Sequence, residues 1–224
     1  AEILDLDSSD EQIEKLEIQL AASLSQLGQV AAVLTSARQS AAESVSGLVS
    51  AELTQLAMSG ARFQVRISEL GEFEASGKDK VEFLLASHPG AEPRPLSKGA
   101  SGGELSRIML ALELVLASEK TMPTMIFDEV DAGVGGAAAT ELAKRLKKLS
   151  ESTQVIVVTH LAQVAALADH QISVSKDISG EITLTSVREL SGPEREVEIA
   201  RMLSGSPDSE SALSHAKELL NSTN

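Results

Sequence analysis

The sequence predicts an α/β protein, because short apolar runs alternate with segments that have the apolar spacing of helices. Two of the apolar runs end in polar residues: residues 124–129 end in Asp-Glu, and residues 155–160 end in Thr-His. A glycine-rich turn at residues 101–103 directly precedes a segment with helical spacing. Because α/β sheets bind ligands where their strands end, we expect these three stretches to form the ligand site.

The composition indicates a folded protein with an aliphatic core. The chain has 224 residues, of which 42% are hydrophobic and 2% aromatic. This length allows one domain with an appendage, and this hydrophobic content excludes wholesale disorder. Cysteine is absent, which excludes disulfides and thiolate metal sites and fits a reducing cytoplasm. We expect no membrane segment, because no apolar run approaches the ~20 residues of a span, and the acidic start is not a signal peptide.

The charge of the chain argues against non-specific binding of nucleic acid. The net charge is −14, so any contact with DNA must come from a local basic patch or from sequence outside this chain. The one dense basic run holds Lys144, Arg145, Lys147 and Lys148. We interpret this run as the solvated face of a helix.

Residues 10–57 are predicted to form a helix with the narrow apolar seam of a coiled coil. The residues of this seam are Ile13, Leu16, Leu20, Leu27, Val30, Leu34, Ala37, Ala41 and Leu48, with serines at two further positions. Ser8 or Ser9 is expected to cap the start of the helix. No second heptad run of comparable length follows, so the partner helix is expected outside this chain. Two helices folded into a hairpin, with bends at Gly28 or Gly47, are the alternative.

Two half-buried strands are expected next, joined by a polar connection at residues 69–80. The alternating residues that predict them are Phe63, Val65 and Ile67 in the first strand and Val81, Phe83 and Leu85 in the second. A proline-rich loop at residues 88–95 then leads to the glycine-rich turn.

The remainder of the chain is predicted to alternate between helices and strands. The expected elements are a helix to about 118, a turn at 120–123, a buried strand at 124–127, a loop at 131–136, a helix around 142–149, a strand at 155–158, a short helix to 168, a hairpin around 179–180, a helix from Pro193 to about 203, and a last helix at about 209–220.

The polar residues of the predicted site suit phosphate chemistry. Backbone N–H groups at residues 101–103 lie where a helix begins and can bind a phosphate, although an ordinary glycine-rich loop is the alternative. Asp128 could hold Mg²⁺ through water, and Glu129 could polarise an attacking water. The alternative for the acids is that Asp128 or Asp131 caps the next helix. His160 could donate to a phosphate oxygen or be a structural residue.

Three stretches carry a family resemblance: residues 98–107 (KGASGGELSR), 127–136 (FDEVDAGVGG) and 155–164 (VIVVTHLAQV). Their order resembles the C-terminal half of an ABC-type ATPase head. Their amino-acid sequences most resemble those of the RecN family of SMC-like bacterial DNA repair ATPases. The glycines at 133–136 favour this family over condensin-type chromosomal SMC proteins. Gly99 and Ala100 depart from the usual pattern, but they leave the serine and glycines of the turn unchanged.

The resemblance implies an ABC/SMC-type head, here its C-terminal half at residues 59–224, preceded by a coiled-coil arm at residues 1–58. Two complete heads would sandwich two ATP molecules with Mg²⁺. Asp128 would bind the metal, Glu129 would orient the hydrolytic water, and His160 would contact the γ-phosphate. The residues implied to bind nucleotide on the opposing head are Ser101, Gly102, Gly103 and Asp131. The resemblance also implies that Glu104 belongs to the nucleotide-binding residues.

No G-x-x-x-x-G-K-[ST] motif occurs in the chain. ATPases of this class need that phosphate loop, so we expect half of an ATPase that is inactive alone and begins inside the returning coiled-coil arm. The expected partners are the N-terminal half of the same head, a second head, and DNA in the complete protein, in the bacterial cytoplasm at the nucleoid and without a membrane. The alternatives are a chromosomal SMC head, a transporter's nucleotide-binding subunit, and a non-enzymatic coiled-coil module.

Overall fold

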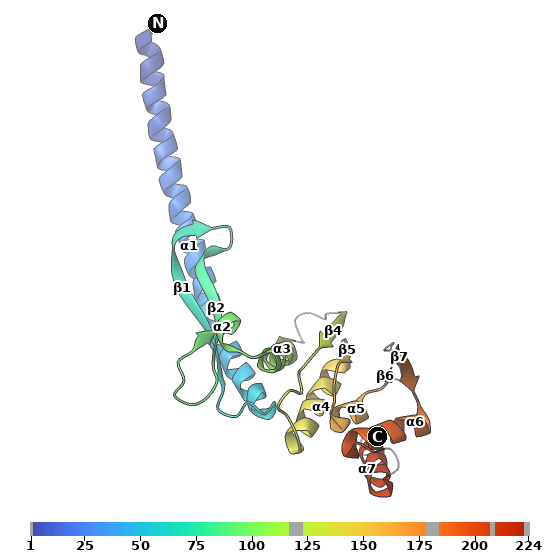
Figure 1. Cartoon of the computed structure of the whole chain (residues 1–224). Coiled ribbons are helices and arrows are strands. Elements are labelled where there is room, and N and C mark those ends of the chain that lie inside the picture. Colours follow the sequence, from blue (N-terminus) through green and yellow to red (C-terminus); the bar gives the residue numbers. More distant parts are fainter. Residues whose placement is uncertain (1, 117–122, 178–183, 207–208, 222–224) are drawn as a thin grey trace. The chain divides into compact units, whose positions relative to one another are not determined.

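The computed structural model describes residues 2–116, 123–177, 184–206 and 209–221. They form two compact units, one of residues 1–47 and 64–84 and the other of residues 48–63 and 85–224 (Figure 1). A long helix and a strand pair each contribute residues to both units. The division at residue 58 stays a prediction.

The N-terminal helix is confirmed. Helix α1 (Glu2–Gln55) is continuous over 54 residues, which corresponds to about 80 Å of helix. The alternative of two helices folded into a hairpin is therefore wrong. The helix begins at Glu2, so the predicted cap at Ser8 or Ser9 is also wrong; no glycine or proline lies between Glu2 and these serines to stop a helix.

A strand pair completes the first unit. Strands β1 (Arg62–Glu74) and β2 (Gly77–Ala86) confirm the two predicted strands, but the connection between them is only residues 75–76. The longer predicted connection at residues 69–80 is wrong. Its polar residues continue the strands instead, because most side chains near the turn are exposed to water and need not be apolar.

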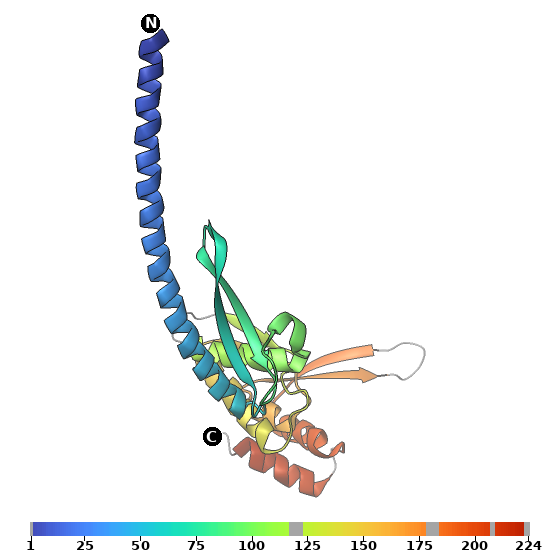
Figure 2. The same ribbon diagram turned by 90° about the vertical axis from the view of Figure 1, so that its left-hand side faces the viewer.

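Strands β1 and β2 run beside α1 within this unit (Figure 2). Hydrogen bonds attach them to one face of the helix. Thr35 Oγ1 donates to Asp79 Oδ1 at 2.8 Å, and Arg38 Nη1 donates to Asp79 Oδ2 at 3.0 Å. Burial alone would raise the pKa of Asp79, but the hydrogen bonds from Thr35 and Arg38 outweigh it and lower that pKa. In the same unit, Val65 N donates to Ser46 Oγ at 3.0 Å.

The buried carboxylate of Asp79 should make the first unit sensitive to acid. Because its pKa is lowered on folding, it stabilises the unit above about pH 4, the usual value for aspartate, and this contribution disappears as the pH falls through the lowered value. Asp79→Asn should therefore speed amide hydrogen exchange in residues 64–84 at pH 7 and reduce the further loss at pH 3. Glu72→Gln, an exposed change on the same strand pair, is the control. Equal exchange rates in Asp79→Asn and the parent chain would contradict this role.

The predicted seam of α1 lies beside the face that contacts the strands, and it stays exposed. Ile13, Leu16 and Val30 are 54%, 63% and 67% exposed. Among the described residues, no second helix covers this seam. The coiled coil therefore remains a prediction, for which the exposed seam supplies the surface.

The expectation that no apolar run approaches a membrane span was wrong. Within Glu11–Gln55, one stretch is long and apolar enough to cross a membrane by length and composition. Residues 18–37 carry no charged side chain, although glutamines and serines interrupt them. A lipid bilayer offers such side chains no water as a hydrogen-bond partner. Length and composition alone therefore do not make α1 a membrane helix.

The second unit contains the remaining elements close to their predicted positions. They are β3 (Arg94–Pro95), α2 (Leu96–Gly99), α3 (Gly102–Leu116), β4 (Thr124–Phe127), α4 (Ala137–Ser150), β5 (Gln154–Val157), α5 (Ala162–Leu167), β6 (Gln171–Asp177), β7 (Leu184–Leu190), α6 (Gly192–Ser204) and α7 (Glu210–Asn221). The short β3 and α2 were not predicted. Most of the predicted turn at 120–123, and the hairpin turn at 179–180, lie outside the described residues.

Strands β4 and β5 pair in parallel, with Phe127 opposite Val157. Phe127 is 4% exposed, whereas Ile126 and Ile156 on the other face of the pair are 70% and 45% exposed. The prediction of a fully buried strand is therefore wrong for this chain. Parallel strands are usually covered on both faces, but here α4 packs against β5 and the described residues leave the other face open.

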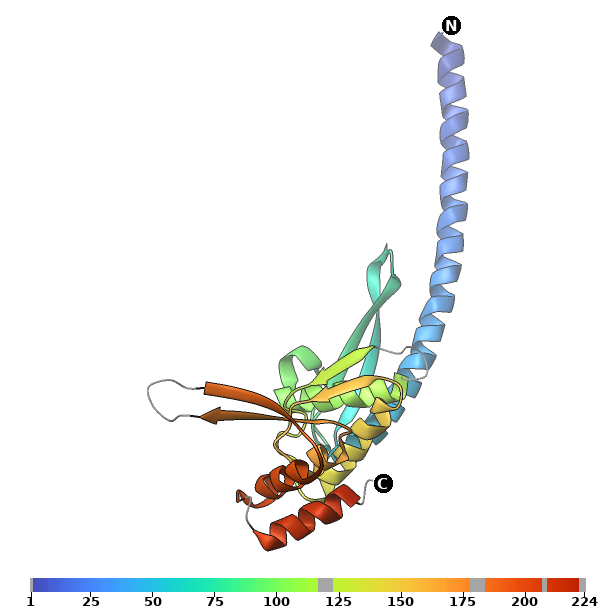
Figure 3. The ribbon, with the colours of Figure 1, turned by 90° about the vertical axis from the view of Figure 1, so that its right-hand side faces the viewer.

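The last helices pack on an alanine-rich core, as the scarcity of aromatic residues predicts. Helices α6 and α7 lie side by side (Figure 3). Together with α5 they contribute Ala162, Ala165, Ala166, Ile199, Ala200, Ala212 and Ala216 to this core. Arg195 donates through Nη2 to the carbonyl oxygens of Ala165 and Ala166, both at 3.0 Å, and thereby satisfies the end of α5. The predicted hairpin is confirmed in β6 and β7, which pair antiparallel with Val174 opposite Val187.

Candidate functional site

The glycine-rich turn begins α3 with a capping box. Ser101 donates to Glu104 Oε2 from its backbone N at 2.8 Å and from its Oγ at 2.9 Å, while Glu104 N donates to Ser101 Oγ at 3.4 Å. The hydrogen bond from the Ser101 N–H is the main cause that lowers the pKa of Glu104. The predicted nucleotide-binding pair Ser101 and Glu104 therefore also has a local role in starting the helix.

The two glycines bring α3 against the Asp-Glu segment of the same chain. A Cβ at Gly103 would lie 2.9 Å from Ala132 Cβ and 3.0 Å from the carbonyl oxygen of Glu129. A Cβ at Gly102 would lie 2.7 Å from Glu129 Oε2. Only glycine permits the approach at residue 103, because the neighbouring atoms include backbone. The structure thus places the predicted phosphate-binding turn beside the predicted catalytic glutamate.

The backbone of Glu129 has a left-handed conformation, with φ +56°. Non-glycine residues adopt such φ values at a cost of about 1–3 kcal/mol, and they do so where the surroundings fix them. The carbonyls on both sides of Glu129 accept hydrogen bonds from α3: Ser106 Oγ donates to the oxygen of Asp128 at 2.8 Å, and Arg107 Nη1 donates to that of Val130 at 3.2 Å. The same Nη1 also reaches the oxygen of Ala132 at 2.8 Å.

Sequence reasoning missed the roles of Ser106 and Arg107. Arg107 is 8% exposed, and its burial lowers the pKa of the guanidinium. The signal in the sequence was a cation one turn after Gly103, on the otherwise apolar buried side of α3, since buried arginines require acceptors. Local spacing could not identify the acceptors of Arg107, because they lie 23 and 25 residues further along the chain.

Asp131 links the loop after Glu129 to the predicted histidine. Its Oδ2 accepts hydrogen bonds from Thr159 Oγ1 at 2.5 Å and from His160 N at 3.1 Å, and it lies 3.3 Å from His160 Nδ1. Asp131 is 2% exposed, so in this structure its carboxylate serves its own chain. The predicted contact of Asp131 with nucleotide on a second head remains a prediction. The role of Thr159 was not anticipated.

The alternative in which these acids cap the next helix is wrong. Helix α4 begins after Gly136, and no side chain caps it. Asp128 and Glu129 are exposed, and neither side chain forms a hydrogen bond or ion pair with any residue that the structure describes. Both carboxylates are therefore available for a cation or a water, which is the chemistry predicted for them.

The protein ligands for Mg²⁺ would be few. Within the described ranges, no group of three or more His, Asp or Glu side chains could hold a metal ion. A single exposed carboxylate such as Asp128 fits Mg²⁺, which usually keeps several waters and uses one or two carboxylates together with substrate phosphates. The residues present therefore fit a magnesium ion bound together with a nucleotide.

The basic run on α4 is largely paired with acids. Arg145 Nε lies 2.8 Å from Glu52 Oε2, Lys144 lies 2.7 Å from Glu141, and Lys147 forms an ion pair with Asp169. This pairing supports the interpretation of the run as a solvated helix face and argues against a nucleic-acid site there.

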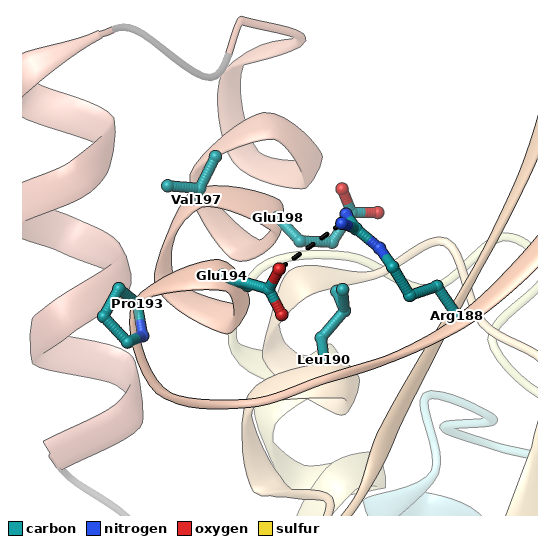
Figure 4. Close-up of a pocket in the computed structure, with 6 residues that line it drawn as sticks. All are labelled: Arg188, Leu190, Pro193, Glu194, Val197 and Glu198. Atoms are coloured by element: carbon teal, nitrogen blue, oxygen red, sulfur yellow. Dashed lines mark hydrogen bonds and ion pairs between the residues drawn. The ribbon is translucent and has the colours of Figure 1, made fainter.

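A pocket of about 300 Å³ lies between β7 and α6, away from the predicted site residues (Figure 4). It is lined by Arg188, Leu190, Pro193, Glu194, Val197 and Glu198. The Arg188–Glu194 ion pair at 3.3 Å spans it. None of the predicted site residues lines this pocket, so it is not a candidate for the predicted chemistry.

Comparison with known proteins points to one family. The family model described as "RecF/RecN/SMC N terminal domain" matches residues 4–183. The DNA repair protein RecN of Streptomyces coelicolor is 53% identical over 207 residues, 87% of this chain and 36% of that protein. RecN of Deinococcus radiodurans is 44% identical over 219 residues, 98% of this chain and 38% of that protein. The chain thus spans less than two fifths of the length of these relatives.

Solved structures show a similar fold. An Smc head domain with an extended coiled coil from Pyrococcus furiosus, bound to the C-terminal domain of ScpA, matches with a TM-score of 0.52 and 23% identity over 79% of this chain and 42% of that one. An Smc head domain with a coiled coil and joint from Pyrococcus yayanosii matches with a TM-score of 0.51 and 23% identity over 78% of this chain and 29% of that one.

Proposed function

Because the chain belongs to the RecF/RecN/SMC family, we propose that it is the C-terminal portion of an ATP-hydrolysing head in a RecN-type protein that repairs DNA double-strand breaks by recombination. The fold of SMC heads and the similarity to RecN proteins support an SMC-like ATPase of DNA repair. The observation that carries the proposal is the arrangement around Glu129. This strained acid forms no hydrogen bond or ion pair with the described residues, and it lies between the glycine-rich start of α3 and the loop that Asp131 ties to His160.

The residues of this chain have distinct tasks in the proposed reaction. ATP with Mg²⁺ supplies the phosphoryl group and the cation that neutralises its charge. Asp128 holds the cation through water, Glu129 orients the attacking water and accepts its proton, and His160 donates to the γ-phosphate. The Ser101 N–H is used by the capping box, but the N–H groups of Gly102 and Gly103 remain at the start of α3. There they bind a phosphate of the nucleotide on an opposing head.

The proposed partners are other parts of the complete protein. The open face of β4 and β5, with Ile126, Ile156 and Val158 exposed, fits the N-terminal half of the same head, which would bring the phosphate loop. The exposed seam of α1 fits the other strand of a coiled-coil arm. A second head closes on the first when ATP is bound, and hydrolysis releases it. Contact with DNA falls to the rest of the protein, because this chain is acidic and most of its dense basic run is paired.

The alternative of a non-enzymatic coiled-coil module gains some support from the exposed seam alone. A module of that kind has no need of a strained glutamate beside a glycine-rich helix start. We therefore favour the ATPase head, in a protein of the bacterial cytoplasm that acts on DNA.

The isolated chain should not hydrolyse ATP, because it contains no phosphate loop. The measurement is phosphate release by the purified chain over hours, with the complete protein as the positive control. Turnover by the chain alone that disappears in Glu129→Gln would show that its residues form a whole catalytic site, and the proposed division of the head would be wrong.

A further inference from the structure

We propose that Ser106 and Arg107 are positioning residues that hold Glu129 in its left-handed backbone conformation and thereby set the rate of hydrolysis without touching ATP. This inference rests on the proposed function, since it assigns Glu129 to the attacking water. We call Ser106 and Arg107 together the α3 clamp.

The first support is the way in which the clamp surrounds the strained residue. Two adjacent side chains on α3 bind the carbonyls of the residues before and after Glu129: Ser106 Oγ donates to Asp128 O at 2.8 Å, and Arg107 Nη1 donates to Val130 O at 3.2 Å. The carbonyl of Glu129 itself accepts from Ala132 N at 3.0 Å. Three successive carbonyls are thus fixed, so the peptides on both sides of Glu129 cannot rotate freely towards the preferred conformations of a non-glycine residue.

The second support is the cost of the clamp. Arg107 is buried, and its Nε has no hydrogen-bond partner among the described residues. The two nearby acids that favour its charge are Glu104 and Asp131. Burying a guanidinium with one orphan donor is unfavourable, and an aliphatic side chain would pack in its place with less desolvation. The hydrogen bonds of the guanidinium explain why an arginine is buried here, because they join the carbonyls of Val130 and Ala132 to α3.

The third support is the contact between α3 and the loop at Gly103. A side chain at residue 103 would displace the loop, because its Cβ would lie 2.9 Å from Ala132 Cβ and 3.0 Å from the Glu129 carbonyl oxygen. The start of α3 and residues 128–132 therefore move together. A phosphate bound at the start of α3 would act on the position of Glu129 through the α3 clamp.

The test uses the complete protein and steady-state ATP hydrolysis. Ser106→Ala and Arg107→Met each remove clamp donors, and each should lower kcat by about 10- to 100-fold, because small displacements of a reacting group cost that much. The affinity for ATP should stay within about twofold. Ser106→Thr keeps the hydroxyl and should restore most of the rate. Met109→Ala, which truncates a 41% exposed side chain further along α3, is the matched control and should leave kcat unchanged.

A double-mutant cycle separates positioning from a general structural role. In a Glu129→Gln background the clamp substitutions should cause little further loss of the residual rate, because the group that they position is already disabled. The proposal would be overturned if the clamp substitutions lowered the rate by the same factor in the Glu129→Gln background as in the parent protein. A normal kcat in Ser106→Ala would also overturn it. Ser106 is only partly buried, so Ser106→Ala remains informative if Arg107→Met fails to fold. If Glu129→Gln itself has no effect, the proposed function fails, and that outcome is distinct from failure of the clamp.

Discussion

Glu129→Gln in the complete protein should reduce ATP hydrolysis by about 10²–10⁴-fold, the usual contribution of a general base, while ATP still binds. Glutamine keeps the size of the side chain and its ability to hydrogen-bond, but its amide cannot accept the proton of the attacking water. Glu129 is exposed and makes no hydrogen bond or ion pair to the described residues, so the exchange removes no structural contact. The variant should therefore accumulate with ATP bound and its heads closed.

The measurement combines phosphate release with light scattering in the presence of ATP. The expected result is a persistent ATP-dependent dimer with almost no turnover. Glu92→Gln is the matched control, since Glu92 is also exposed and forms no hydrogen bond or ion pair with the described residues. Turnover of Glu129→Gln at the normal rate would remove Glu129 from its assigned role.

Ser101→Arg in the complete protein should abolish ATP-dependent head closure and reduce turnover to the background, while a single head still binds ATP. An arginine at the start of α3 would fill the space that a phosphate from the opposing head needs and would shield the N–H groups behind it. The capping box would survive in part, because the Ser101 N–H hydrogen bond to Glu104 comes from the backbone. The defect should therefore arise at the interface and not in folding.

Ser101→Ala is the matched control for this substitution. It removes the hydroxyl of the capping box, at a cost of about 1 kcal/mol in stability, but leaves room for a phosphate. Heads that carry Ser101→Ala should still close in the presence of ATP, but less tightly than the parent heads, because Ser101 belongs to the predicted nucleotide-binding set. Mixing Ser101→Arg with a phosphate-loop variant should restore one composite site of the two.

In the structure, Ser101 lies close enough to the acids of its own chain that a loss of ATP affinity in the single head would also be informative. Glu129 Oε2 lies beside Gly102 within the same chain, so the glycine-rich turn is not remote from its own acids. Equal loss of monomer affinity and of dimerisation in Ser101→Arg would mean that Ser101 contacts nucleotide on its own head. The sandwich of two heads would then be wrong for this chain.

Periodicity in the sequence was sufficient to predict most of the helices and strands. Helix α1 follows from the helical spacing of its apolar residues, and strand β4 follows from an apolar run that is too short for a helix. The extent of β1 and β2 did not follow, because exposed strands carry polar residues such as Glu69 and Lys80 that resemble a loop. The exposure of Ile126 could not be predicted either, because an apolar side chain does not reveal which part of the protein covers it.

The candidate site was predictable in its chemistry but not in its connections. Asp128, Glu129 and His160 were identified from their places at strand ends. The partner of Asp131 is Thr159, 28 residues away, and that contact depends on the parallel pairing of β4 with β5. The α3 clamp likewise joins residues whose proximity arises only from tertiary packing, so no spacing rule predicts it.

The central claim is that this chain supplies the hydrolytic glutamate to a site whose phosphate loop comes from another part of the same protein. Its most direct test is ATP turnover after mixing the purified chain with the separately produced N-terminal portion of the complete protein. We predict no turnover from either part alone, turnover from the mixture, and loss of that turnover when the chain carries Glu129→Gln. Turnover of the mixture that is unchanged by Glu129→Gln would contradict the account.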